Sequence, residues 1–515
     1  MRSLAGDVMS AVKSDPRSAV INALPLIAIC LLPVLLYLPA MGSPFERDEG
    51  VYATVAQGLL HGQMPYRDLF DNKPPMVYAW YALSFTLFGE HVVAPRILAS
   101  VLLSLTTLSL FSQARMVFPR GVAYVAAGLF GLSTGLPFVA LHANTEAYMM
   151  LPLVTSLVAF TVGVRRGEGL RWFVLSGALC GAAMMTKQVA FWNLAALMAV
   201  AVAWRWKSSG FTWRTVVPSA ALLGGAAASV AVVAVPFALT GSLDELFYAN
   251  ISYNWLYVGV LSYSERFADF ASGTAYVAAI AAPLAAGAVW GLLTLIRRRK
   301  QPLDYLLVVW ALASFAGVAT GGRFFPHYFL HLMPAAAVLT ALVIYEVVTK
   351  RRIQPIGKPA IAVAALMVVV SLGTIAVMYV APRAAEQRIA ESVAEQKEWE
   401  SNSRQLGEYI AARTEPEEEI FNFGREAQIY FYADRRPAVR YFSDWPFWWD
   451  ERTLYGTIKA LRTTKPVYII DTAQPPLFED YEQYHPPVLM NLLNEDYEYV
   501  GRLYFADIYR LKPQQ

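Results

Sequence analysis

Two adjacent carboxylates, Asp48 and Glu49, follow the first long apolar run of the chain. A carboxylate at this position can take the proton from a hydroxyl group that attacks an activated carbon. A structural interpretation is also open, because acidic residues stabilise the first turn of a helix through its dipole. The spacing of Val51, Val55 and Leu59 predicts a short interfacial helix that begins at this pair.

Lys73 is followed directly by two prolines, which fix the backbone beside its ammonium group. A rigidly placed ammonium at a membrane surface suits a lipid phosphate. The alternative is a lysine that anchors a helix by snorkelling to the interface. Lys187 lies between two apolar runs with only Gln188 as a polar neighbour. A lone charge so close to the membrane is typical of a functional site, although a turn at the outer surface also accommodates it.

A third polar segment, residues 321–331, brings arginine, tyrosine and two histidines to the end of another apolar run. Arg323 can bind a phosphate through two hydrogen bonds. His327, with Tyr328 beside it, can donate a hydrogen bond or a proton to a substrate. His327 and His331 are four residues apart, so on a helix they would share a face and could bind a metal, but no carboxylate accompanies them.

Three further polar residues are expected on the same side of the membrane. His142 and Glu146 repeat the four-residue spacing, and Arg96 stands at the start of an apolar run. Arg96 is a further partner for a phosphate or a carboxylate, or else an interface anchor. For the histidine and the glutamate, the alternative is a polar cap at the end of an apolar helix.

The composition is that of a polytopic α-helical membrane protein. Of 515 residues, 56% are hydrophobic and 16% charged, whereas soluble domains have about 25% charged residues. The net charge of +3 does not indicate nucleic-acid binding, because the basic residues lie in short clusters between apolar runs. Cys30 and Cys180 both lie inside such runs, so we expect neither a disulfide nor a cysteine-ligated metal.

Eleven apolar runs are long enough to cross a bilayer as helices. They lie near residues 20–40, 92–114, 121–138, 147–164, 171–186, 189–204, 215–239, 272–296, 303–320, 332–348 and 359–381. The shorter apolar segment Met76–Phe88 is predicted to be a second interfacial helix. Clusters of lysine and arginine alternate between the loops, and the positive-inside rule places them, with the N-terminus, in the cytoplasm. The loops that carry the candidate residues then lie outside the cell (inner) membrane.

The composition changes near residue 382, which predicts a transmembrane domain of residues 1–381 and a soluble extracytoplasmic α/β domain of residues 382–515. Residues 385–414 have a charged helical pattern. Strands are predicted at 419–423, 438–442, 467–470 and 497–505, and helices near 425–432 and 451–463. A domain of this length is within the usual range.

Three segments resemble C-type glycosyltransferases, in particular the bacterial relatives of protein O-mannosyltransferases and of the transferases that add aminoarabinose to lipid A. They are residues 47–75, with the motifs RDEGVYA, PYRD and NKPP, residues 186–188 (TKQ), and residues 323–330 (RFFPHYFL). The resemblance implies a C-type fold, two interfacial helices in the first outer loop, and an inverting transfer from a polyprenyl-phosphate sugar.

By position in these motifs, Asp48 would be the catalytic carboxylate with Glu49 as its helper, and Lys73 would bind the carrier phosphate together with Arg323. The aminoarabinose transferases have an acidic residue before the matching lysine, where this chain has Asn72. This departure counts against a metal at that position and against that acceptor. The resemblance leaves open the sugar, the acceptor and whether a divalent cation takes part.

We therefore predict an integral-membrane glycosyltransferase that uses a lipid-linked sugar and a lipid, glycan or protein acceptor, in contact with membrane lipids. The residues predicted to help bind the phosphate are Lys187 and Arg96, and those predicted to contact substrate are His327, Tyr328, His142, Glu146 and Tyr66. The alternative is a transporter or flippase for a lipid-linked sugar. A transporter would show repeat symmetry and ionisable groups near mid-span, whereas the ionisable residues here lie at the ends of the runs.

Overall fold

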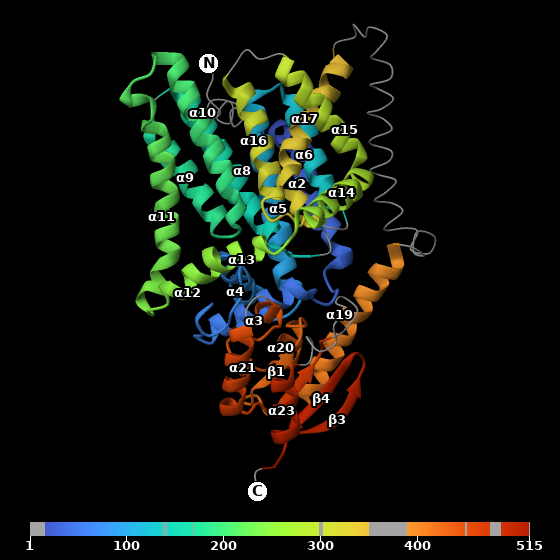
Figure 1. Cartoon of the computed structure of the whole chain (residues 1–515). Helices are drawn as coiled ribbons and strands as arrows, with labels where there is room; N and C mark the ends of the chain where they lie inside the picture. Colours follow the sequence, from blue (N-terminus) through green and yellow to red (C-terminus); the bar gives the residue numbers. More distant parts are fainter. Residues whose placement is uncertain are drawn as a thin grey trace.

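The computed structural model of the chain describes residues 16–136, 139, 142–167, 169–297, 302–349, 389–448, 451–473 and 486–513. Figure 1 shows a helical bundle and, at one end of it, a smaller part that contains a β-sheet. We call the described residues from 389 to 513 the sheet region. The predicted span 359–381 and the predicted domain boundary at residue 382 lie outside the described residues.

The bundle consists of α2 (Pro16–Tyr37), α5 (Val93–Val117), α6 (Arg120–Ser133), α8 (Thr145–Arg166), α9 (Leu170–Met184), α10 (Phe191–Ser209), α11 (Val217–Leu239), α14 (Tyr263–Ile280), α15 (Ala282–Arg297), α16 (Pro302–Ala319) and α17 (Met333–Thr349). Among the described residues, six helical segments are long and apolar enough to cross a membrane, or seven if α14 and α15 count as one span. The chain is thus a multi-pass membrane protein, and the count of eleven spans stays a prediction.

Each predicted run within the described residues falls on one helix, except the run 272–296. There the chain bends by 102° between α14 and α15. Pro283, at the second position of α15, explains the break. A proline has no N–H group to donate, and its ring clashes with the carbonyl four residues earlier, which favours a bend at this position, although α2 and α8 continue through internal prolines.

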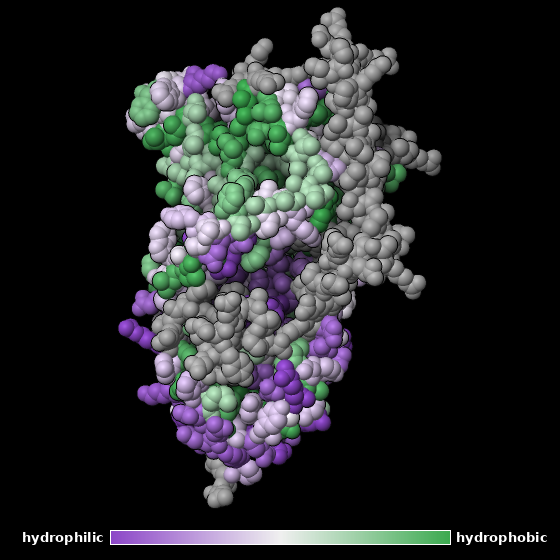
Figure 2. All heavy atoms as spheres, turned by 45° about the vertical axis from the view of Figure 1, so that its right-hand side comes forward, coloured by the Kyte–Doolittle hydropathy of each residue, from purple (hydrophilic) through white to green (hydrophobic). Residues whose placement is uncertain are grey.

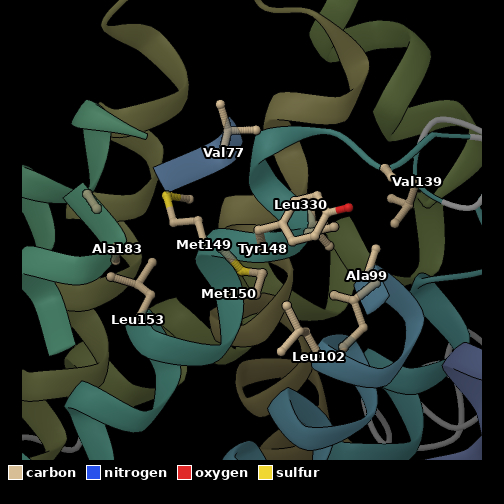
Figure 3. Close-up of a cluster of buried hydrophobic side chains, with 14 of the residues drawn as sticks. Val77, Ala99, Leu102, Val139, Tyr148, Met149, Met150, Leu153, Ala183 and Leu330 are labelled. Atoms are coloured by element: carbon tan, nitrogen blue, oxygen red, sulfur yellow. The ribbon is translucent and has the colours of Figure 1, made fainter. Parts of the chain in front are cut away.

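The core lies where α8 passes between α5, α9 and the connecting segments. Figure 3 shows Tyr148, Met149 and Met150 of α8 among buried side chains of these neighbours. On the other side, α9 and α11 pack backbone to backbone. A Cβ atom on Gly177 would lie 1.9 Å from the carbonyl oxygen of Leu222, so only glycine permits this approach, as is common between membrane helices.

Two helices of the first long loop, α3 (Arg47–Leu60) and α4 (Met76–Phe88), lie between the bundle and the sheet region (Figure 1). Both were predicted, but α3 is not a surface helix, because residues 49–56 are all buried. The remaining short helices of the membrane part are η1 (Leu38–Ala40), η2 (Gln188–Ala190), η3 (Trp213–Thr215), α12 (Leu243–Phe247), the π-helix η4 (Tyr248–Ser252), α13 (Tyr253–Gly259) and η5 (Pro326–Leu332).

The sheet has the strand order β1-β2-β4-β3, with β1 and β2 parallel and the other pairs antiparallel. Its elements are α19 (Ile389–Ala411), β1 (Ile420–Phe423), α20 (Gln428–Ala433), η6 (Trp445–Trp448), α21 (Glu451–Thr464), β2 (Tyr468–Asp471), α23 (Pro487–Asp496), β3 (Tyr497–Leu503) and β4 (Ala506–Leu511). Figure 2 shows a hydrophobic surface over the bundle and a largely hydrophilic one over the sheet region.

One strand prediction in this region was wrong. Residues 438–442 form no strand, because the carbonyl of Arg440 accepts a hydrogen bond from the backbone N–H of Phe70 in the first loop instead of from a neighbouring strand. The predicted strand 497–505 is confirmed as β3, and the sequence interpretation missed β4, which pairs with it in a hairpin. The hairpin turns at Tyr504, whose φ of 56° lies in the left-handed region.

Candidate active site

The loops predicted to lie outside the membrane meet at the end of the bundle that carries the sheet region. The amide of Asn254 on α13 donates to the carbonyl of Asn72 at 2.8 Å, and the amide of Gln188 donates to the same oxygen at 3.4 Å. Lys187, between α9 and η2, pairs with Glu146 at the start of α8. Segments that are far apart in the sequence therefore form one group of polar side chains, which we call the loop cluster.

Asp48 lies in the first turn of α3. A capping box starts this helix, since the Glu46 carboxylate accepts from the backbone of Glu49 and the Glu49 carboxylate accepts from that of Glu46. Asp48 is partly exposed, and the hydroxyl of Tyr52 lies 3.5 Å from its Oδ2. Its charge acts on Lys73, so Asp48 faces the loop cluster.

Glu49, the next residue, points into the protein. Its carboxylate accepts hydrogen bonds from Arg96 Nη2 at 2.6 Å and from the backbone N–H of Ala143 at 2.7 Å. Neither charged side chain is exposed to solvent. Burial raises the pKa of Glu49, but Arg96 and His142 lower it by more, and the resulting pKa is about 2. A carboxylate with so low a pKa is a poor proton acceptor near neutral pH.

Arg96 does not lie beside Lys73. Its three guanidinium nitrogens donate to Glu49 and to four backbone carbonyls near the end of α2, those of Ala40, Met41, Ser43 and Pro44. The five N–H groups of an arginine are then all engaged, so none is left for a lipid phosphate. His142 belongs to the same group, with Nδ1 3.8 Å from the Glu49 carboxylate. We therefore replace the phosphate-binding prediction for Arg96 with a structural role.

The substitution Glu49→Gln is expected to destabilise the protein by about 3–5 kcal/mol, because it leaves the buried Arg96 without its counter-charge. The measurement is the melting temperature of the purified full-length chain in detergent. The folded pKa of Glu49 is lowered, so the pair stabilises the wild type above the unfolded carboxyl pKa of about 4.3. This contribution is lost as the pH falls toward about 2. A variant as stable as the wild type would contradict the structural role.

Lys73 is held in place through its backbone. Its carbonyl accepts hydrogen bonds from the hydroxyls of Tyr66 at 2.6 Å and Tyr78 at 3.2 Å. Tyr66 is fully buried and has a φ of 68°. The tyrosine that we predicted to contact substrate thus positions the lysine backbone. The Lys73 ammonium donates to the side chain of Asn72 at 3.1 Å.

The charges of two carboxylates act on this ammonium group. Burial lowers the pKa of Lys73, but the charges of Asp48 and Asp71 raise it by more. The net change in the pKa is upward, so the lysine is a cation. Burial also raises the pKa of Asp71, against the opposing effects of Lys73 and of the Tyr78 hydroxyl, which donates to Asp71 at 2.7 Å. Asp71 was not among the predicted site residues, although its place two residues before Lys73 was a signal.

Lys187 and Glu146 form a buried ion pair, and the Lys187 ammonium also lies 3.7 Å from the centre of the Tyr328 ring. Burial lowers the pKa of Lys187, with Glu146 acting in the opposite direction. The ring of His327 packs edge-on against Tyr328, with centroids 4.8 Å apart. These four residues, predicted from separate segments, come together. His142 does not join them, because α8 begins at Thr145.

Arg323 is placed for an anion. Its guanidinium lies over the ring of Tyr257, 4.8 Å from the centroid. Its Nε is buried and has no hydrogen-bond partner among the described residues. A buried donor without an acceptor is costly, and a phosphate oxygen would satisfy it. Tyr257 and Asn254, both on α13, were missed by the sequence interpretation, and only their position in an aromatic outer loop marked them.

The four-residue spacing of His327 and His331, which left a shared metal open, does not place the two side chains on one face. The two residues lie on η5, a 3₁₀-helix, where residues four apart do not share a face. His331 points elsewhere, with Nε2 2.7 Å from the side-chain oxygen of Asn193 on α10. Within the described part of the chain, no three His, Cys, Asp or Glu residues are grouped to hold a metal ion.

Comparison with known proteins identifies relatives of this arrangement. Residues 72–237 match the family described as dolichyl-phosphate-mannose-protein mannosyltransferase. No curated protein matches the chain in sequence. ArnT from Cupriavidus metallidurans, solved bound to undecaprenyl phosphate, matches with a TM-score of 0.59 and 15% identity, over 97% of this chain and 100% of that chain.

The oligosaccharyltransferase AglB from Archaeoglobus fulgidus, solved with an inhibitory peptide and a dolichol-phosphate, matches with a TM-score of 0.53 and 13% identity. The match covers 95% of this chain and 74% of that chain. At such identities the likeness concerns the fold. The C-type fold predicted from the loop motifs is thus confirmed, and the family match agrees with it.

Proposed function

We infer that this membrane glycosyltransferase of the C-type fold transfers a sugar from a polyprenyl-phosphate carrier to a hydroxyl group of a lipid, glycan or protein. One observation carries the proposal. A partly exposed carboxylate, Asp48, faces the same loop cluster as Lys73, while Arg323 holds a buried N–H group without a partner. The polyprenyl phosphates bound to ArnT and AglB support a donor of this kind.

The reaction needs a base on one side of the sugar and cations on the other. The acceptor oxygen attacks the anomeric carbon, and the bond from that carbon to the phosphate oxygen breaks. The acceptor proton passes to the carboxylate of Asp48. Lys73 and Arg323 stabilise the negative charge on the departing polyprenyl phosphate, and attack opposite the phosphate inverts the anomeric centre.

The remaining residues of the loop cluster have supporting roles. The ion pair of Lys187 and Glu146 holds Tyr328 against the site, and His327 packs on that ring. We propose that His327 and Tyr328 contact the sugar or the acceptor. The proposed transfer uses side chains alone, and the sequence left participation of a divalent cation open.

We also propose that the loop cluster faces the outside of the cell membrane. The basic clusters of the chain lie in the loops that alternate with those of the cluster, and basic loops stay in the cytoplasm. The outer side holds no free nucleotides, so a donor used there has to be carried by a lipid. Under this proposal residues 1–381 form the membrane domain and residues 382–515 an extracytoplasmic domain.

The test uses membranes of a host that lacks the protein, supplied with radiolabelled polyprenyl-phosphate sugars and with wild type or Asp48→Asn. We expect label to leave the carrier and to appear in lipid, glycan or protein only with the wild type, and the labelled product names the acceptor class. Label that crosses the bilayer equally in both samples, without a new product, would contradict transfer and favour a flippase.

A further inference from the structure

The sheet region packs directly on the helix that carries Asp48. The hydroxyl of Thr54 on α3 donates to the carbonyl of Ala427, just before α20, at 3.1 Å. A Cβ atom on Gly50 would lie 2.6 Å from the backbone nitrogen of Gln428. No side chain fits between these two backbones. The face of α3 that carries Gly50 must therefore point toward α20.

Aromatic side chains extend this contact beyond the start of α3. The hydroxyl of Tyr432 accepts a hydrogen bond from the backbone N–H of Phe45 at 2.7 Å. The ring of Phe431 packs edge-on against Phe45, with centroids 5.0 Å apart, and stacks on Phe85 of α4 at 5.6 Å. The sheet region thus contacts both helices of the first loop.

One buried carboxylate lies at the centre of this contact. Glu426 is 2% exposed, and its side chain accepts hydrogen bonds from Arg47 Nε at 2.7 Å, from Gln428 at 2.5 Å and from the hydroxyl of Ser403 at 3.3 Å. The three donors come from α3, α20 and α19. Arg47 is the first residue of α3 and stands directly before Asp48.

We propose that Glu426 is a positioning residue for the transfer reaction. By holding Arg47, it fixes the first turn of α3 and therefore the direction in which Asp48 presents its carboxylate. This inference rests on the proposed function. Sequence position gives no hint of it, because Arg47 and Glu426 are 379 residues apart. A displacement of about 1 Å at a reacting group can cost about 100-fold in rate.

The experiment is a double-mutant cycle with Arg47→Gln, Glu426→Gln and the double variant, all in the full-length chain. Each single variant is expected to lower kcat by about 10- to 100-fold and to change KM for the lipid-linked donor by less than about threefold, because the proposed function assigns donor binding to Lys73 and Arg323 and not to this pair. The double variant should lose no more than the worse single variant, since both changes break one interaction. Arg47→Lys, which keeps the charge, should recover most of the rate.

Glu408→Gln is the matched control, because Glu408 pairs with Arg404 on the exposed face of α19. Its kcat should equal that of the wild type. Unchanged kcat in both single variants, losses that multiply in the double variant, or equal losses in the control would overturn the proposal.

Hydrogen exchange of the peptide that covers residues 47–60 provides a readout that needs no substrate. Glu426→Gln should speed exchange of these amides by about tenfold or more, and Glu408→Gln should leave it unchanged. Unchanged exchange in Glu426→Gln would overturn the positioning role. Faster exchange, with a wild type that transfers no sugar, would support the positioning of α3 and refute the proposed function.

Discussion

Replacement of Asp48 by asparagine is expected to lower kcat for sugar transfer by about 10²- to 10⁴-fold, the usual contribution of a general base. Asparagine has nearly the same shape but cannot accept the acceptor proton. The side chain is partly exposed, and its one hydrogen-bond contact among the described residues is the Tyr52 hydroxyl at 3.5 Å from Oδ2, so the fold should survive. Initial rates with purified protein and a labelled lipid-linked sugar measure kcat and KM separately.

Glu49→Gln is the matched comparison, because it removes the neighbouring carboxylate. Glu49 is buried against Arg96, so its loss should lower stability, whereas Asp48→Asn should lower the rate at unchanged melting temperature. Asp48→Glu keeps a base at a shifted position and should retain part of the activity. A rate for Asp48→Asn within about tenfold of the wild type would show that another group takes the proton.

Helical spacing alone does not separate these two carboxylates, and only the family motif assigned the catalytic role to Asp48. Residues i and i+1 of a helix point about 100° apart, so one of the pair faces inward, but the pattern does not say which. The choice depends on Arg96, which is 47 residues away, and on the backbone of Ala143. Long-range partners of this kind leave no local signal in a single sequence.

Local patterns were reliable where local physics decides the structure. The apolar runs, the spacing of Val51, Val55 and Leu59, and the acidic pair at the start of α3 all act over a few residues, and the structure has helices where they predict them. The break at Pro283 was not predicted, and a proline alone does not mark such a break, because α2 and α8 continue through Pro25 and Pro152.

Spacing misled where the type of helix was assumed. His327 and His331 would share a face of an α-helix, but the segment is a 3₁₀-helix. His142 and Glu146 were read in the same way, although the helix begins only at Thr145. The loop cluster itself was predicted from the side of the membrane on which its residues lie. That argument does not depend on helix type, which explains why it gathered Lys187, Glu146 and Tyr328 correctly.

The two cations proposed to bind the donor phosphate, Lys73 and Arg323, are held by different groups, so we expect their effects on donor binding to be independent. Lys73 is fixed by hydrogen bonds from Tyr66 and Tyr78 to its backbone carbonyl, and Arg323 is fixed by the ring of Tyr257. Neither cation depends on the other for its position. Loss of one therefore should remove its own interaction with the phosphate and leave the other in place.

Lys73→Ala is accordingly expected to lower kcat/KM for the lipid-linked sugar by about 10²- to 10³-fold, as for removal of one group that stabilises developing charge. Because the charges of Asp48 and Asp71 act on the Lys73 cation, its loss also leaves these carboxylates to repel the phosphate. Inhibition by free polyprenyl phosphate should weaken in parallel, since the product carries the same group. Lys73→Arg, which keeps the charge, should retain more activity than Lys73→Ala.

The control for this prediction is Lys459→Ala, an exposed lysine on α21 in the sheet region, which should match the wild type in rate and inhibition. Arg323→Ala should show a loss of similar kind, because its unpartnered Nε is the other donor available to the phosphate. If Lys73→Ala is inhibited by polyprenyl phosphate at the same concentration as the wild type, the lysine does not bind the carrier. Its ammonium would then serve only to neutralise Asp48 and Asp71, and the phosphate site would have to be sought around Arg323 alone.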